Sequence, residues 1–246
     1  MRLFGRSILS AIGGEWTYRR WVEPWILRRA HEALIARTDN FGRLAWLGVP
    51  IWQPILDLWT IQETLFEIKP DLVIECGTNR GGSSFFFGQL FDVMGRGRVI
   101  TIDVQKMHDI QHPRVTYLIG SSVAREIVSR VSKEVAATSG PVLVILDSDH
   151  SAGHVGNELT AYHGFVTPGS FLLVQDGIID LLPRFASARP GPLPAIDDFL
   201  REHPEFELDA ERCERFIWTT TRRDGCAGDI NGSNRKVCSG GCAPQS

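Results

Sequence analysis

The amino-acid sequence predicts a doubly wound α/β fold, in which helices cover both faces of a mainly parallel sheet. Short, almost wholly apolar runs alternate with helical patterns through the middle of the chain, as is typical of strands joined by crossover helices. Glycines follow the first run, and Glu75, Asp103, Asp147 and Asp176 lie at the ends of four runs. Because ligands bind beyond the carboxyl ends of parallel strands, we expect these acids at one binding edge.

Three regions are predicted along the 246 residues. Residues 1–45 are expected to form an N-terminal helical extension, because arginine and glutamate separate their apolar residues. Residues 46–221 have a suitable length for one α/β domain. Residues 222–246 are rich in Gly, Ser and Asn and poor in large apolar residues, so we expect a disordered tail. The cysteines of the C-terminal part lack the spacing of a standard zinc site.

The elements of the domain are predicted in chain order. An ordered loop with two prolines and several aromatic residues leads into a helix over residues 61–68. Alternating strands and helices follow. The strands cover residues 71–75, 98–103, 115–119, 142–146 and 170–174, and the helices cover residues 84–93, 123–135 and 154–165.

Composition and charge restrict the class of protein. The apolar content of 43% and the charged content of 22% are ordinary for a soluble globular protein. A net charge of -3 gives no reason to expect nucleic acid as a partner. No segment is long and apolar enough to span a bilayer, so we expect a cytoplasmic protein. Peripheral membrane contact through N-terminal tryptophans is an alternative, and assembly into a homo-oligomer is left open.

The turn after the first strand predicts the cofactor. It lacks the G-x-G-x-x-G pattern of dinucleotide binders and the Gly-Lys-Ser/Thr of a phosphate-binding loop. Asp103 can accept hydrogen bonds from both hydroxyls of a ribose, and a carboxylate at Glu75 suits a ligand with an ammonium and a sulfonium. These features favour a turn that binds S-adenosylmethionine over a turn that merely closes a strand–helix connection. The predicted cofactor-binding residues are Glu75, Gly77, Thr78, Gly81, Gly82, Ser83, Asp103, Ser121 and Ser122.

A second group of polar residues follows the fourth and fifth strands. Asp147, Asp149 and His150 follow one strand, and Gln175 and Asp176 follow the other. Their oxygens suit a hard divalent cation such as Mg²⁺, and an imidazole can take a proton near neutral pH. The alternative is that Asp147 and Asp149 cap the next helix. Three residues of that helix are assigned no role: Glu158 is expected to be solvated, and His154 and His163 to lie at the surface or core edge.

Several segments resemble the cephalosporin hydroxylase/rhamnosyl O-methyltransferase family. The most specific is Leu-Asp-Ser-Asp-His-Ser at residues 146–151. The resemblance covers roughly residues 46–220 and implies a Rossmann-like methyltransferase fold, S-adenosylmethionine as methyl donor and a divalent metal. The other matching segments are residues 46–50, 57–63, 69–75, 77–78, 81–83, 154–155, 175–176, 191–192, 195–196, 209–212 and 218–219.

The resemblance also implies roles for individual residues. It assigns Asp147, Gln175 and Asp176 to the metal and His150 to the general base. Related metal-dependent sugar O-methyltransferases have an acidic pair at the second metal segment, and Gln175 replaces one of these acids here. A glutamine keeps a carbonyl oxygen but carries no charge, so metal affinity should fall unless Asp149 compensates. Residues 220–225 also differ from the usual ending of the family.

The predicted function is methylation of a hydroxyl on a sugar, a glycolipid or a glycosylated natural product. The acceptor is therefore expected to be a small or glycosylated molecule. The main alternative is a non-catalytic, cofactor-binding partner of a tailoring complex, in which Gln175 marks a decayed metal site. A nicotinamide-dependent oxidoreductase is disfavoured by the missing glycine pattern.

Overall fold

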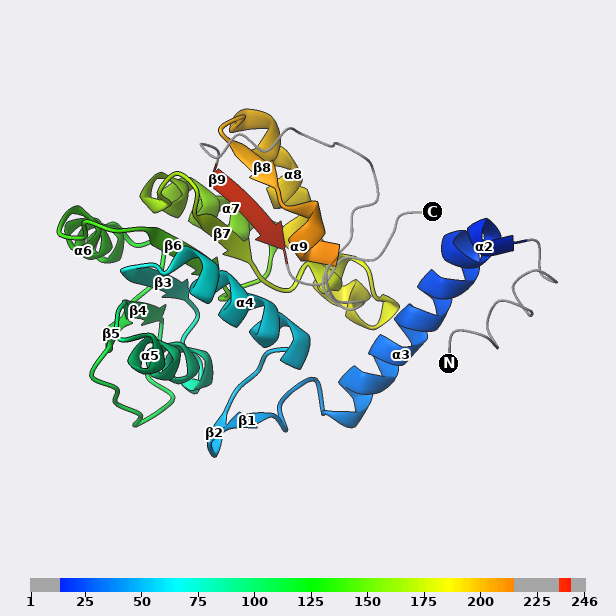
Figure 1. The fold of residues 1–246 in the computed structure, drawn as a ribbon, viewed down its shortest axis with the longest axis horizontal. Coiled ribbons are helices and arrows are strands. Elements are labelled where there is room, and N and C mark those ends of the chain that lie inside the picture. Colours follow the sequence, from blue (N-terminus) through cyan, green and yellow to red (C-terminus); the bar gives the residue numbers. More distant parts are fainter. Residues whose placement is uncertain (1–13, 215–234, 240–246) are drawn as a thin grey trace.

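The computed structural model describes residues 14–214 and 235–239. Its centre is a seven-stranded sheet with the order β5-β4-β3-β6-β7-β9-β8, and every pair of neighbouring strands is parallel (Figure 1). The predicted doubly wound fold with a mainly parallel sheet is confirmed. The strands are β3 (Leu72–Cys76), β4 (Arg98–Asp103), β5 (Val115–Ile119), β6 (Val142–Leu146), β7 (Phe171–Val174), β8 (Phe206–Leu208) and β9 (Arg235–Ser239).

Helices cover both faces of the sheet because alternate side chains of each strand point to opposite faces. Val73 and Leu143 pack with the helices of one face, whereas Ile74 and Val144 pack with those of the other. Burying a side chain of this kind contributes about 1.5–3 kcal/mol. The first face carries α4 (Ile55–Ile68), α5 (Gly82–Met94) and α9 (Ala210–Glu214), and the second carries α6 (Arg125–Ala136), α7 (Ala152–Tyr162) and α8 (Pro192–Glu202).

The strand order reverses between β3 and β6. From β3 the chain continues to β4 and β5 on one side, and β6 and β7 then extend the sheet on the other side. The carboxyl ends of β3 and β6 are joined by a hydrogen bond of 2.8 Å from the Asp147 amide to the Cys76 carbonyl. In open parallel sheets, such a reversal leaves a crevice in which ligands bind.

A helical arm precedes the sheet. It consists of α2 (Gly14–Thr17), a π-helical turn over Tyr18–Val22, and α3 (Glu23–Arg37), which runs outward from the sheet in Figure 1. The predicted helical extension is therefore present over residues 14–37. Ile35 near the end of α3 packs with Ile178 and Leu182 beyond β7. Among residues 14–214 and 235–239, no helix is both long and apolar enough to cross a membrane.

The start of the domain differs from the prediction. Helix α4 begins at Ile55, with Pro54 as its N-cap, rather than at residue 61. Proline is compatible with a helix start because the first amides of a helix have no intrahelical partner. The preceding loop also contains a short hairpin, β1 (Ala45–Trp46) and β2 (Val49–Pro50). Within the expected loop, Pro50 thus ends β2 and Pro54 precedes α4.

The tail also differs from the prediction. Disorder was expected over residues 222–246, but Arg235–Ser239 form β9 between β7 and β8. Val237 pairs with Leu172 on one side and with Leu208 on the other, and its side chain is fully buried. A strand that is hydrogen-bonded on both sides can be held without a long apolar run, so a polar composition did not exclude it. The rest of the predicted tail lies outside the described residues.

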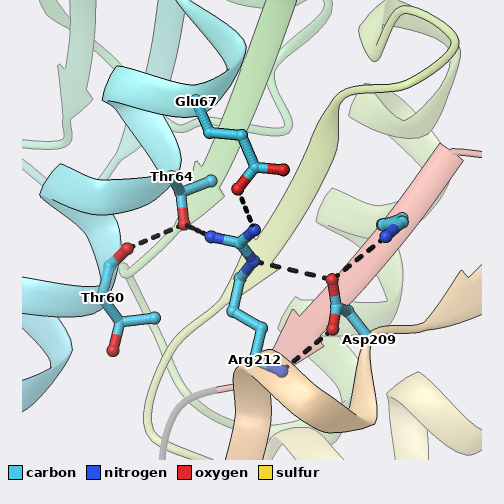
Figure 2. Close-up of polar contacts among 6 residues, drawn as sticks. Thr60, Thr64, Glu67, Asp209 and Arg212 are labelled. Carbon is cyan, nitrogen blue, oxygen red and sulfur yellow. Dashed lines mark hydrogen bonds and ion pairs between the residues drawn. The ribbon is translucent and has the colours of Figure 1, made fainter. Parts of the chain in front are cut away.

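A buried arginine connects this C-terminal region to the first face of the sheet. Figure 2 shows the Arg212 guanidinium between α4 and Asp209. It donates a hydrogen bond of 2.6 Å to Thr64 and another to Glu67, and Nε lies 3.6 Å from Asp209. Asp209 also lies 3.3 Å from Nζ of Lys236 in β9. One cation thus links α4, α9 and, through Asp209, β9.

We expect Arg212→Met to lower the free energy of unfolding by about 3 kcal/mol, because it leaves the largely buried carboxylate of Asp209 with a weaker counter-charge. Urea denaturation followed by circular dichroism measures this change. The matched control is Arg201→Met, because the ion pair of Arg201 with Asp198 is exposed and should contribute less than about 1 kcal/mol. Equal effects of the two substitutions would contradict the assigned role of Arg212.

Candidate active site

A cavity of about 630 Å³ opens at the carboxyl ends of β3, β4, β6 and β7. Most of the predicted site residues line it, although they come from five separate turns. Glu75, Gly81 and Gln175 are not among the lining residues. The predicted residues that line the cavity are Gly77, Thr78, Gly82, Ser83, Asp103, Ser121, Ser122, Asp147, His150 and Asp176.

The turn after β3 is packed closely against two other backbone segments. Gly77 has a φ of +104°, and a Cβ atom at this position would lie 1.9 Å from the Asp147 carbonyl oxygen. A Cβ on Gly82 would lie 2.2 Å from the carbonyl oxygen of Pro50 in β2. Only glycine fits at either position, because the obstructing atoms belong to the backbone. The glycines therefore bring the turn, the end of β6 and the β1–β2 hairpin together around the cavity.

Glu75 lies fully buried beneath this turn. Its Oε2 accepts a hydrogen bond of 2.6 Å from Thr101, whereas its Oε1 has no hydrogen-bond partner. Burial raises the pKa of Glu75 to about 7, although the nearby hydroxyls of Ser83 and Thr101 oppose the shift. A positively charged ligand above the turn would stabilise the ionised carboxylate.

Asp103 at the end of β4 is held in a fixed orientation. Oδ2 accepts a hydrogen bond of 2.8 Å from the Asn79 amide, and Oδ1 accepts one of 3.2 Å from the Gln105 amide. Each carboxylate oxygen retains a second lone-pair direction. The carboxylate is thus available to ligand hydroxyls from the edge of the cavity.

An acidic cluster lies on the other side of β3, at the ends of β6 and β7. Asp147, His150 and Asp176 each present one ligand atom, and these atoms lie within 4.8 Å of one another. His150 Nε2 lies 3.0 Å from Asp176 Oδ2, and Gln53 Nε2 donates a hydrogen bond of 2.8 Å to Asp147 Oδ2. Burial and the Asp176 charge raise the pKa of Asp147 well above its usual value, and the same two causes raise that of Asp57 to about 8.

The cluster fits a divalent cation. Buried carboxylates repel one another and lose hydration, and a cation among them removes both penalties. The raised pKa values of Asp57 and Asp147 record these penalties. The carboxylate oxygens of Asp147 and Asp176 suit Mg²⁺ or Mn²⁺, with water or substrate oxygens completing the sphere.

Asp149 and Gln175, which were expected to support the metal, are not among the three residues of the acidic cluster. Asp149 accepts a hydrogen bond of 2.8 Å from the Ser151 amide, and this bond is the largest cause that lowers its pKa. Asp149 lines the cavity and orders the loop before α7, but the N-cap of this helix is Ser151, so the capping alternative for Asp149 is not confirmed. Gln175 is buried and does not line the cavity. A metal role for Gln175 stays a prediction that the cavity lining does not support.

Glu158 was expected to be solvated, and this expectation is wrong. Its side chain is fully buried because it lies on the face of α7 that turns toward the sheet. Its Oε1 accepts hydrogen bonds of 2.6 Å from both Ser122 and Ser148 and lies 3.2 Å from His154 Nε2. All three partners line the cavity, so one buried carboxylate positions part of the cavity wall.

Sequence reasoning missed Gln53 and Asp57. Both lie before β3 in the sequence, so nothing in their spacing relates them to the acids after β6 and β7. The available signal was Asp57 in an otherwise apolar helix turn, inside a segment that resembles the family. Their positions depend on α4, whose first turn meets the acidic cluster.

Comparison with known proteins identifies the family. The family model described as "Rhamnosyl O-methyltransferase/CmcI" matches residues 40–226. The chain belongs to this family. The resemblance seen in the sequence is confirmed, and with it the prediction of an O-methyltransferase.

Relatives within the rhamnosyl O-methyltransferase/CmcI family include curated mycobacterial proteins. The rhamnosyl O-methyltransferase of Mycobacterium tuberculosis (strain ATCC 25618 / H37Rv) is 33% identical over 193 residues, which cover 73% of this chain and 78% of the relative. That of Mycobacterium leprae (strain TN) is 31% identical over 182 residues, covering 71% and 78% respectively.

Solved structures of the rhamnosyl O-methyltransferase/CmcI family share the fold. The structure named "CmcI-N160 apo-structure" aligns with a TM-score of 0.57 and 19% identity over 73% of this chain and 74% of that one. The structure named "cmcI-D160 Mg-SAM" aligns with a TM-score of 0.55 and 18% identity over 73% and 75%.

Proposed function

We propose that this O-methyltransferase moves a methyl group from S-adenosylmethionine to a hydroxyl oxygen of a sugar-containing acceptor, with a divalent cation such as Mg²⁺ at Asp147 and Asp176. The observation that carries the proposal is the shared cavity, which is lined both by the turn after β3 and by the acidic cluster. The names of the curated relatives and of the solved structure "cmcI-D160 Mg-SAM" support it.

The residues at and around the turn after β3 suit the charges of S-adenosylmethionine. Glu75 lies beneath the turn with an unpartnered oxygen, and its negative charge stabilises a ligand that carries an ammonium and a sulfonium. Asp103, oriented by two backbone amides, accepts hydrogen bonds from the ribose hydroxyls. The glycines of the turn let the backbone approach the ligand closely.

The acidic cluster suits deprotonation of the acceptor. Asp147 and Asp176 would hold the cation, which would supply Lewis acidity toward an acceptor hydroxyl. Gln53 orients Asp147 through their hydrogen bond. In His150, Nε2 faces Asp176, so the hydrogen on Nε2 is directed to that carboxylate and Nδ1 is left to take the proton of the hydroxyl. Asp176 then stabilises the imidazolium that results.

A methyl-transfer assay with radiolabelled S-adenosylmethionine and rhamnosyl glycosides, before and after metal removal with EDTA, tests the proposal. Transfer should require the divalent ion and should return when Mg²⁺ is restored. Methyl transfer that is unaffected by EDTA would contradict the metal role. Cofactor binding by calorimetry without transfer to any hydroxyl acceptor, and without dependence on Mg²⁺, would instead indicate the non-catalytic partner.

Cofactor affinity should depend on pH through Glu75. Below about pH 7 a cationic cofactor must displace the proton from Glu75, so its affinity should fall by up to about tenfold per pH unit. Isothermal titration calorimetry between pH 5.5 and 8.5 measures the slope. Glu75→Gln is the control, because it should bind more weakly at high pH and flatten the dependence. A slope that persists in this variant would place the titrating group elsewhere.

The same group has the opposite effect on the cofactor-free protein. An acid whose pKa is raised on folding binds its proton more tightly in the folded state. Its contribution to stability is therefore complete below the unfolded pKa of about 4.3 and is lost as the pH rises through about 7.

A further inference from the structure

Three metal-binding side chains meet at the amino ends of the strands, at the edge of the sheet opposite the cavity. His163 begins the short helix that follows α7, His203 is the C-cap of α8, and Glu205 directly precedes β8. One imidazole nitrogen of each histidine and one carboxylate oxygen of Glu205 lie within 4.8 Å of one another. These residues come from three elements, and none lines the cavity.

The hydrogen bonds of the cluster orient both imidazoles and leave the Nε2 lone pair of His163 free. His163 Nδ1 lies 2.9 Å from the Leu159 carbonyl, which can only accept, so Nδ1 carries the hydrogen and Nε2 presents a lone pair. Metal-bound histidines typically have this backbone hydrogen bond on the second nitrogen. His203 Nδ1 and Glu205 Oε1 share a hydrogen bond of 3.0 Å, which a bound ion would replace. Their separation is near the roughly 3.4 Å between two ligands around a tetrahedral ion with bonds of about 2.1 Å.

Aromatic packing holds the two imidazole rings in place. The His203 ring stacks on Phe199 with centroids 4.4 Å apart, and Phe199 also contacts the His163 ring edge to face at 5.7 Å. The two imidazole centroids are 4.3 Å apart. The cluster thus has two oriented imidazoles and one carboxylate on ordered elements.

We propose that His163, His203 and Glu205 bind one Zn²⁺ ion at a second metal site, separate from the cavity. Two imidazoles and one carboxylate are ligands that Zn²⁺ prefers, whereas Mg²⁺ favours oxygen ligands and retains its water. From the present spacing, the ligand atoms need to approach by no more than about 1.4 Å to reach a tetrahedral arrangement. Bound Zn²⁺ would join the ends of α7 and α8 to the start of β8 and thereby stabilise this edge of the domain.

Calorimetric titration with Zn²⁺ tests the proposal in the full-length chain carrying Asp147→Asn and Asp176→Asn, which removes the acidic cluster as a competing site. We expect one tight Zn²⁺ per chain and, at about 100 times the Kd, a rise in Tm of about 5 °C. His203→Ala should abolish this binding, and Glu205→Gln should weaken it at least about tenfold. Glu205 is about half exposed, so its replacement should leave the fold intact.

Glu202→Gln is the matched control, because Glu202 is an exposed acid at the same end of α8 but outside the cluster. Its Zn²⁺ affinity should equal that of the parent. Carbethoxylation mapped by mass spectrometry gives an independent measurement, in which Zn²⁺ should protect His163 and His203 from the reagent. Zn²⁺ binding that persists in both His203→Ala and Glu205→Gln, or histidines that remain unprotected at saturation, would overturn the proposal.

Discussion

Replacement of His150 by alanine is expected to lower kcat for methyl transfer by about 100- to 10,000-fold, because the variant lacks the base that removes the hydroxyl proton. The affinity for S-adenosylmethionine should not change, since the proposed cofactor-binding residues, the turn after β3 and Asp103, do not include His150. Single-turnover assays measure the chemical step, and calorimetry measures cofactor binding. The residual rate should also rise with pH, because hydroxide or an ionised acceptor then replaces the imidazole.

Metal titration of the same variant distinguishes two roles for the imidazole. His150 contacts Asp176 and lies within the group that can hold an ion, so it could act as a ligand as well as a base. If it is the base, Mg²⁺ affinity should survive in His150→Ala but not in Asp176→Asn. Asp149→Asn is the matched control from the same loop, and it should keep near-parental activity because an asparagine oxygen can accept the same hydrogen bond from the Ser151 amide. An equal loss of metal affinity and kcat in His150→Ala would contradict a role limited to proton transfer.

Gly77→Ala should destabilise the protein by more than about 4 kcal/mol, an exceptional effect for adding one methyl group. The new Cβ would lie 1.9 Å from the Asp147 carbonyl oxygen and 2.5 Å from its carbonyl carbon, and φ at this position is +104°. Neither obstructing atom can move without separating the ends of β3 and β6, where the Asp147 amide bonds to the Cys76 carbonyl. Urea denaturation measures the loss of stability, and calorimetry should show that cofactor binding is lost with it.

Gly156→Ala provides the comparison for this substitution. Gly156 lies inside α7, and a Cβ there would have no atom within 4 Å. Alanine has a higher helix propensity than glycine, so this variant should gain up to about 1 kcal/mol. If Gly77→Ala were as stable as Gly156→Ala, the close packing of the turn against β6 could not be correct.

The sequence allowed the central part of the fold to be predicted closely. The strands over residues 98–103, 115–119 and 142–146 have the predicted bounds. Their apolar runs are continuous because both faces of a parallel sheet are buried, and the glycines and acids after them mark the strand ends. The same pattern placed most of the predicted site residues around one cavity, because the carboxyl ends of parallel strands share one edge of the sheet.

Features that depend on tertiary contacts were not predictable in this way. Gln53 and Asp57 meet the acidic cluster only because α4 packs across the first face of the sheet. Glu158 has the sequence context of a solvated helix residue, and its burial follows from the orientation of α7. Residues 235–239 form a strand because β7 and β8 supply hydrogen bonds on both sides, which composition does not reveal.

The position of β9 also has a consequence for how the chain reaches its native state. In the register of the sheet, Phe171 of β7 pairs with Lys236 of β9, 65 positions later (236 minus 171). Strand β8 is synthesised before β9, yet in the sheet β9 lies between β7 and β8. During translation, β7 therefore presents an open edge until residues 235–239 have emerged, and such edges can pair with other chains. The last two strands must join the sheet together, in a late, long-range step that is slow compared with local folding.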